Sequence, residues 1–166
     1  MERVLILPPR VTETGLAFAD AARRRGLDDA PVLVSDVVRF EVEFRLFVAA
    51  GRVLAASRYA VDGELDLAAS VADPRCAEAA AFASTLFAAG MPELPSAVVV
   101  DVGLLAGAGA GGPEWAVIEA NAAWASGHYA ADPDGALDVV LAASRPVAGI
   151  APEDRRFLRH LPAVSR

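Results

Sequence analysis

The sequence predicts an α+β fold: an antiparallel sheet of two β-hairpins with helices on one face, preceded by a short β-α unit. Three observations support this prediction. Strand-like segments come in two adjacent pairs between residues 41 and 121, each pair is followed by a helical segment, and one apolar run with its own helix opens the chain.

The opening run is Val4-Leu5-Ile6-Leu7, which is short and continuously apolar, as in a buried strand. Thr12 or Thr14 can cap a helix over residues 16–25, and Gly26 ends it. We expect residues 1–30 to form this β-α unit.

The first predicted hairpin joins residues 41–48 to residues 52–59. Apolar and polar side chains alternate along the first segment, which is typical of a half-buried strand. Ala50-Gly51 supplies the turn between the two segments.

A two-residue turn would pair Ala49 with Arg52 and so set Arg58 opposite Glu43. In this register Glu43, Arg45 and Arg58 share one face of the sheet. A slip of one residue would separate them.

The second predicted hairpin joins residues 96–103 to residues 115–121 through the Gly/Ala-rich stretch 106–112. The two hairpins and their helices define a domain over residues 31–150. Residues 151–166 are expected to form a C-terminal tail.

The helices have clear start signals. Asp73-Pro74 and Asp132-Pro133 each place a capping acid before a proline at the first helical position. The first helix is expected to end at Gly90 and the second near Ala143, and a short polar helix is expected within residues 153–161.

Three polar side chains interrupt the second hairpin. Asp101 and Glu119 are equidistant from Ala110, so an antiparallel pairing sets them opposite or nearly so. Asn121 lies two residues beyond Glu119 and therefore on the same face. We expect these three side chains to converge on an uncovered face of the sheet.

This grouping suggests phosphate chemistry. Two close carboxylates favour a cation between them, and oxygen ligands without His or Cys are the set that Mg²⁺ prefers. Arg45 and Arg58, projecting from the neighbouring hairpin, would neutralise phosphate charge beside the metal.

Ordinary structural explanations remain open for the same residues. Arg45 and Arg58 with Glu43 would also form a cross-strand salt bridge on a solvated face. Asp101 would also mark the end of a strand, and Trp124 and Tyr129 are often packing residues.

Composition restricts the partners. The 22 acidic and 15 basic residues give a formal charge of −7 and a pI near 4.8, which disfavours nucleic acid and anionic membranes. No apolar run is long enough to span a membrane, and a cytoplasmic location is expected. Cys76 is the single cysteine, and every basic residue is arginine.

Several segments together resemble the C-terminal half of an ATP-grasp protein, in particular the small ATP-grasp proteins. The resemblance extends over roughly residues 32–143. The segments that carry it are Glu43–Val48, Arg58-Tyr59, Val100–Gly103, Val117–Trp124 and Ser126–Tyr129.

The resemblance implies roles for these residues. Asp101, Glu119 and Asn121 would hold Mg²⁺ on the ATP phosphates. Arg45 and Arg58 would be catalytic and would contact the phosphates together with the carboxylates. Substrate would be bound by Glu43, Trp124, Ser126 and Tyr129.

The resemblance implies an Mg²⁺- and ATP-dependent carboxylate-amine or peptide-type ligase that forms a carbon–nitrogen bond through an acyl phosphate. ATP-grasp enzymes normally place lysines on the phosphates from a second subdomain, and this sequence contains no lysine. The chain thus resembles a shortened member, with the β-α unit as a remnant of a preceding domain. A noncatalytic dimerisation or interaction module is the alternative. The partners expected are a nucleotide and a small-molecule or peptide substrate, and a homodimer is left open.

Overall fold

The computed structural model describes residues 24–25, 38–89, 94–107 and 114–158. The chain divides into two compact units, residues 1–37 and 38–166. The predicted β-α unit lies outside the described residues, apart from Arg24 and Arg25. All elements named below belong to the second unit.

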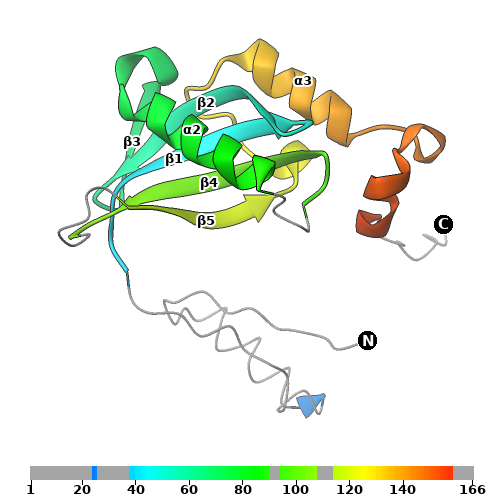
Figure 1. Ribbon diagram of the computed structural model, residues 1–166, viewed down its shortest axis with the longest axis horizontal. Helices are drawn as coiled ribbons and strands as arrows, with labels where there is room; N and C mark the ends of the chain where they lie inside the picture. Colours follow the sequence, from blue (N-terminus) through cyan, green and yellow to red (C-terminus); the bar gives the residue numbers. More distant parts are fainter. Residues whose placement is uncertain (1–23, 26–37, 90–93, 108–113, 159–166) are drawn as a thin grey trace. The chain divides into compact units, whose positions relative to one another are not determined.

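The second unit contains a five-stranded antiparallel sheet in the order β3-β2-β1-β4-β5 (Figure 1). This confirms the predicted α+β class, with hairpins β1-β2 and β4-β5 joined through the pairing of β1 with β4. The strands are β1 (Phe40–Ala49), β2 (Arg52–Val61), β3 (Glu64–Ala69), β4 (Ala97–Leu105) and β5 (Trp115–Asn121).

Strand β3 is an addition to the predicted four strands. It follows β2 through Asp62-Gly63, both of which have positive φ angles, as a tight hairpin turn requires. An Asp-Gly pair followed by the alternating Glu-Leu-Asp-Leu is a hairpin signal in the sequence. Most of β3 is exposed, because it is an edge strand with little to pack against.

The β1-β2 hairpin begins in the predicted register and then leaves it. Ala50-Gly51 form the turn with positive φ angles, and Ala49 pairs with Arg52. Register shifts after Val48 and again between Phe44 and Glu43 place Arg58 opposite Phe44. The expected pairing of Arg58 with Glu43 is therefore wrong, because bulges move the side chains of β2 relative to β1.

The β4-β5 hairpin has the predicted register. Asp101 pairs with Glu119 and Val99 pairs with Asn121. A shift occurs only beyond Asp101, toward the connecting loop. The three polar side chains are thus placed as expected along β4 and β5.

Helix α2 (Arg75–Ala88) covers one face of the sheet. Cys76, Ala79 and Ala83 pack there against large side chains such as Phe44 and Leu46, both fully buried. Burying a side chain of that size contributes roughly 1.5–3 kcal/mol, so this layer is a major source of stability.

Helix α3 (Pro133–Ala143) covers part of the opposite face. Ala136 and Val139 pack there against Phe47 of β1 and Val99 of β4. The expectation that both helices cover one face is therefore wrong. The central strands carry apolar side chains on both faces, and each apolar area requires its own cover.

The helix starts follow the predicted signals. The Asp132 side chain accepts a hydrogen bond from the N–H of Gly135 at 2.8 Å, and Pro133 is the first residue of α3. The Asp73 side chain accepts from the N–H of Arg75 at 3.0 Å at the start of α2. Within the described residues α2 ends at Ala88; Gly90 lies outside them.

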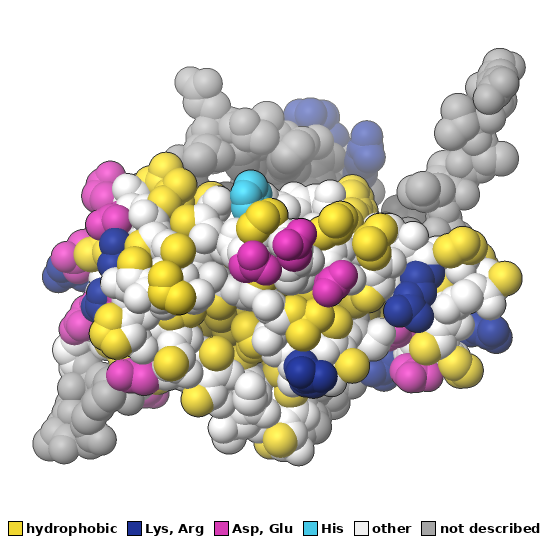
Figure 2. Space-filling view, turned by 90° about the horizontal axis from the view of Figure 1, so that it is seen from above, with side chains coloured by type: hydrophobic (Ala, Val, Ile, Leu, Met, Phe, Trp, Pro, Cys, Tyr) yellow, Lys and Arg dark blue, Asp and Glu magenta, His cyan; other side chains and the backbone are white. Residues whose placement is uncertain are grey.

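The remaining elements are short 3₁₀ helices: η1 (Ser70–Ala72), η2 (Ala123–Ala125), η3 (Val147–Gly149) and η4 (Pro152–Phe157). The short polar helix expected near residue 153 is thus the 3₁₀ helix η4. Asp154 in η4 accepts a hydrogen bond from the N–H of Ser96 at 2.8 Å, which attaches this element to the start of β4. Figure 2 looks down from the α3 side, where hydrophobic side chains are spread over the surface with acidic ones among them.

Candidate functional site

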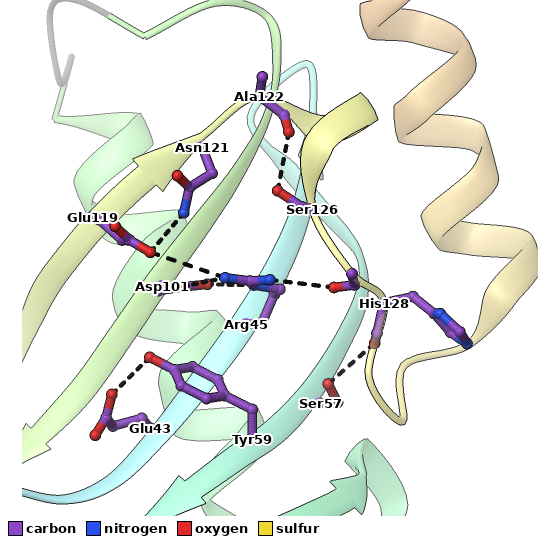
Figure 3. A network of polar contacts seen from close by, with 11 residues as sticks. Glu43, Arg45, Ser57, Tyr59, Asp101, Glu119, Asn121, Ala122, Ser126 and His128 are labelled. Carbon is purple, nitrogen blue, oxygen red and sulfur yellow. Dashed lines mark hydrogen bonds and ion pairs between the residues drawn. The ribbon is translucent and has the colours of Figure 1, made fainter. Parts of the chain in front are cut away.

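A row of polar side chains crosses four strands on the face that α3 partly covers. Ser57 of β2 pairs with Arg45 of β1, Arg45 pairs with Asp101 of β4, and Asp101 pairs with Glu119 of β5. Cross-strand partners project from the same face of a sheet. The antiparallel register therefore builds this row from four segments that are far apart in the sequence (Figure 3).

The centre of the row is a bidentate ion pair. The Nε of Arg45 donates to Oδ1 of Asp101 at 2.8 Å, and Nη2 donates to Oδ2 at 2.6 Å. Both residues are buried, with 8% of Arg45 and 1% of Asp101 exposed. The two parallel hydrogen bonds fix the plane of the guanidinium.

Burial and pairing act in opposite directions on Asp101. Burial raises the pKa of Asp101, and the hydrogen bond from Arg45 works against that rise. The same hydrogen bond raises the pKa of Arg45, so the guanidinium stays charged. A charge buried this deeply needs its partner, because an unpaired one would be costly.

Arg45 is also held from the loop that joins η2 to α3. Its Nη1 donates to the carbonyl oxygen of Gly127 at 3.3 Å. Its guanidinium carbon lies 4.7 Å from the ring centroid of Tyr129 and 5.7 Å from that of Tyr59. These rings stack on each other with centroids 5.3 Å apart. Arg45 is thus fixed by a carboxylate, a carbonyl and an aromatic face.

Glu43 lies on the same strand as Arg45 and accepts a hydrogen bond from the Tyr59 hydroxyl at 2.6 Å. Burial, followed by this hydrogen bond, raises the pKa of Tyr59 well above its ordinary value. The hydroxyl therefore stays protonated and keeps Glu43 oriented. Glu43 was expected to pair with Arg58, and its partner is Tyr59 instead.

Glu119 and Asn121 form the open end of the row. Glu119 Oε1 accepts a hydrogen bond from Asn121 Nδ2 at 2.8 Å and lies 4.0 Å from Arg45 Nη2. The Glu119 side chain is 54% exposed. This end of the row is accessible to a ligand, in contrast to Asp101.

Arg58 lies outside this site. It donates to Asp73 at 2.8 Å and to Asp66 at 2.7 Å, and it pairs across the strands with Phe44, whose side chain packs against the α2 layer. Arg75 also donates to Asp73 at 2.8 Å. The bulges in β2 cause this placement, and the expected grouping of Arg58 with Arg45 is wrong.

The loop residues expected at the substrate site are placed as follows. Trp124 is in η2 and 66% exposed, and the Ser126 hydroxyl donates to the carbonyl oxygen of Ala122 at 3.0 Å. Of the three loop residues, Tyr129 contacts the row, through Arg45. Its φ angle is +52°, so a non-glycine backbone is held in the left-handed region next to the site.

Sequence reasoning missed Ser57 and Tyr59. Ser57 is fully buried, and its hydroxyl is 3.5 Å from the carbonyl oxygen of His128. Both residues are near the arginine of the predicted second strand, but the register without bulges gave them no partner. The signal that could have found them is a polar residue at an inward position of a strand.

The residues present fit a divalent cation only in part. Within the described ranges, His, Cys, Asp and Glu side chains nowhere form a group of three that could hold a metal ion. Both Asp101 oxygens are bonded to Arg45. Glu119 and Asn121 remain as accessible oxygen ligands, and Mg²⁺ is often held by one or two protein groups together with waters and phosphates.

The fold and the polar row define a class of protein before any comparison: a nucleotide-phosphate-binding sheet of the ATP-grasp type. The sequence matches the family model of an ATP-grasp domain, the second family of its clade, over residues 6–139. The chain therefore belongs to this ATP-grasp family. No curated protein and no solved structure matched the chain.

The matched region begins within the predicted N-terminal β-α unit, so the family includes most of that segment together with the sheet. Among the described helices, none combines the length and apolar character needed to cross a membrane.

Proposed function

We propose that the polar row binds the phosphates of an Mg²⁺-nucleotide and that the protein is an ATP-dependent carboxylate-amine ligase of the ATP-grasp type. The observation that carries this proposal is the fixed Arg45 guanidinium next to the exposed oxygens of Glu119 and Asn121. A buried cation beside accessible oxygen ligands is suited to a phosphate and its metal.

The charge balance of this face supports a metal-bound nucleotide over a free one. Three carboxylates, those of Glu43, Asp101 and Glu119, lie around the Arg45 guanidinium. A phosphate chain alone would be repelled by this arrangement. Magnesium held by Glu119 and Asn121 would neutralise phosphate charge and so allow binding.

Arg45 keeps donors for this role. A guanidinium has five N–H groups, and the bonds to Asp101 and Gly127 use three of them. The Nη2 group faces Glu119 across 4.0 Å, at the open end of the row. A phosphate oxygen placed there would accept from Arg45 while its metal contacts Glu119.

In the proposed reaction a substrate carboxylate oxygen attacks the γ-phosphorus of ATP, and ADP leaves. The amine nitrogen then attacks the acyl carbon, and inorganic phosphate leaves as the carbon–nitrogen bond forms. Arg45 would stabilise the charge that develops on the transferred phosphoryl group. Glu43, Trp124, Ser126 and Tyr129 are the proposed substrate contacts.

Calorimetry with Mg²⁺ and ADP tests the binding step. We expect Glu119→Gln to weaken binding by roughly tenfold or more, because it removes a charged contact. Glu114→Gln is the matched control: it removes the same charge from an exposed residue just before β5 and should leave binding unchanged. Equal affinity of the two variants would disprove the proposed site.

The noncatalytic module is a second candidate, favoured by exposed apolar side chains. Trp124 in η2 and Leu65 on edge strand β3 are 66% and 70% exposed. Such side chains are common at protein interfaces. Absence of nucleotide binding at millimolar ADP with Mg²⁺, together with a concentration-dependent change in sedimentation, would favour this function over the ligase.

A further inference from the structure

We infer that Asp101 is a positioning residue that holds Arg45, and that a metal in this site would be ligated by Glu119 and Asn121 without Asp101. This inference rests on the proposed function and assigns its parts. It differs from the expectation drawn from the sequence, in which all three residues share one ion.

The first observation is that Asp101 has both oxygens committed. Each accepts a hydrogen bond from a different nitrogen of Arg45, at 2.8 Å and 2.6 Å. The residue is 1% exposed, at the centre of the sheet between β1 and β5. A metal would have to displace a bidentate guanidinium or enter behind it to reach this carboxylate.

The second observation is that the guanidinium itself closes off Asp101. Arg45 is held in place by Gly127 and the ring of Tyr129 in addition to Asp101. In Figure 3 Arg45 lies between the Asp101 carboxylate on one side and the loop carbonyl on the other. Moving Arg45 away would break all of these contacts together.

The third observation is the contrast with the neighbouring strand. Glu119 is opposite Asp101 but mostly exposed, and its bond is to the neutral amide of Asn121. An amide partner is displaced more easily than a buried guanidinium. The accessible oxygens of the row thus belong to β5.

The consequence is a division of labour. Asp101 fixes the direction in which Arg45 presents its remaining N–H groups to phosphate, as a rigid donor requires. Glu119 and Asn121 supply metal contacts. Loss of Asp101 would release Arg45, whereas loss of Glu119 would remove the ion.

Metal binding alone tests this division. Mn²⁺, which can be counted by electron paramagnetic resonance, is titrated into the full chain and into Asp101→Asn, Glu119→Gln and Glu43→Gln. Glu43→Gln is the matched control, since it removes one negative charge from the same face without removing a proposed ligand. We expect Glu119→Gln to lower Mn²⁺ affinity roughly tenfold or more. Asp101→Asn should lower it no more than the control does. A loss at Asp101→Asn equal to that at Glu119→Gln would overturn the inference.

The wild-type chain provides a measurement that does not depend on a variant that folds. With carboxyl-¹³C-labelled Asp and Glu, adding Mg²⁺ should shift the Glu119 carboxyl resonance and leave that of Asp101 nearly unchanged. A larger shift at Asp101 than at Glu119 would contradict the assignment.

The failure of the proposed function would be recognised separately. If the wild-type chain binds neither Mn²⁺ nor nucleotide, the ligase proposal fails, and Asp101 is judged by the Nε–H resonance of Arg45. We expect a sharp, slowly exchanging signal in the wild type and its loss in Asp101→Asn. Rapid exchange of this proton in the wild type would show that Asp101 does not position Arg45.

Discussion

At the residue scale, the buried carboxylates of Asp101 and Asp73 carry arginine partners on opposite faces of the sheet. Asp101 accepts a bidentate pair of bonds from Arg45, whereas Asp73 accepts from both Arg58 and Arg75. Removing an arginine partner from such a carboxylate leaves a buried charge unpaired, so each pair is expected to matter more to stability than a surface ion pair.

The Asp73 cluster makes stability depend on acid pH. Hydrogen bonds from Arg75 first, and then from Arg58, hold the pKa of Asp73 far below its ordinary value. A lowered carboxyl pKa stabilises the fold above the unfolded value near 3.8, and that stability is lost as the pH falls below it. We expect the free energy of unfolding, measured by denaturant titration, to fall below about pH 4.

Asp73→Asn should flatten this acid-side slope and cost about 1–3 kcal/mol at pH 7, because Arg58 and Arg75 lose their shared partner. Asp66→Asn is the control: its side chain is half exposed, so the expected cost is below about 1 kcal/mol. An unchanged acid slope in Asp73→Asn would contradict this assignment.

At the element scale, the packing of α3 against β2 depends on a glycine. A Cβ on Gly135 would be 2.5 Å from the carbonyl oxygen of Leu54 and 3.1 Å from the Cβ of Ala55. These atoms are backbone or rigidly attached to it, so they cannot move aside cheaply. The absence of a side chain is what allows the first turn of α3 to approach the sheet so closely.

We expect Gly135→Ala to destabilise the protein by about 1–3 kcal/mol, measured by denaturant titration, through overpacking. In an exposed helix the same substitution would stabilise by up to about 1 kcal/mol, so the sign is diagnostic. Gly149→Ala, where nothing lies within 4 Å of the added methyl group, should change stability by only a few tenths of a kcal/mol. A stabilised Gly135→Ala would show that α3 is not in close contact with β2.

The elements themselves show where sequence reasoning succeeds. The start of α3 at Asp132-Pro133 and the β4-β5 pairing of Asp101 with Glu119 were predictable, because they depend on local capping and on one hairpin without a bulge in that stretch. The position of Arg58 was not, because bulges are set by how a strand pairs with both its neighbours.

At the scale of the whole molecule, charge decides which ligand form can bind. The chain carries a formal charge of −7, and the polar row itself has more carboxylates than guanidinium groups. Any gain from nucleotide phosphates therefore requires a divalent cation to offset repulsion.

Thermal unfolding checks this. At a nucleotide concentration about 100 times Kd, Mg²⁺-ADP should stabilise the folded chain by about 2.7 kcal/mol, seen as a higher Tm. The same nucleotide with EDTA should give no increase. An equal increase with and without Mg²⁺ would show that the site binds phosphate without a metal.

The sequence by itself determined the α+β class, the two hairpins, the caps of both main helices and the convergence of Asp101, Glu119 and Asn121 on β4 and β5. These features depend on local periodicity, capping chemistry and the pairing of neighbouring segments. Tertiary structure alone decided that Arg45 occupies Asp101, that Arg58 faces the α2 layer and that α3 covers the second face. Each of these depends on the order and bulges of non-neighbouring strands, because only their pairing determines which side chains share a face and which charge finds which partner.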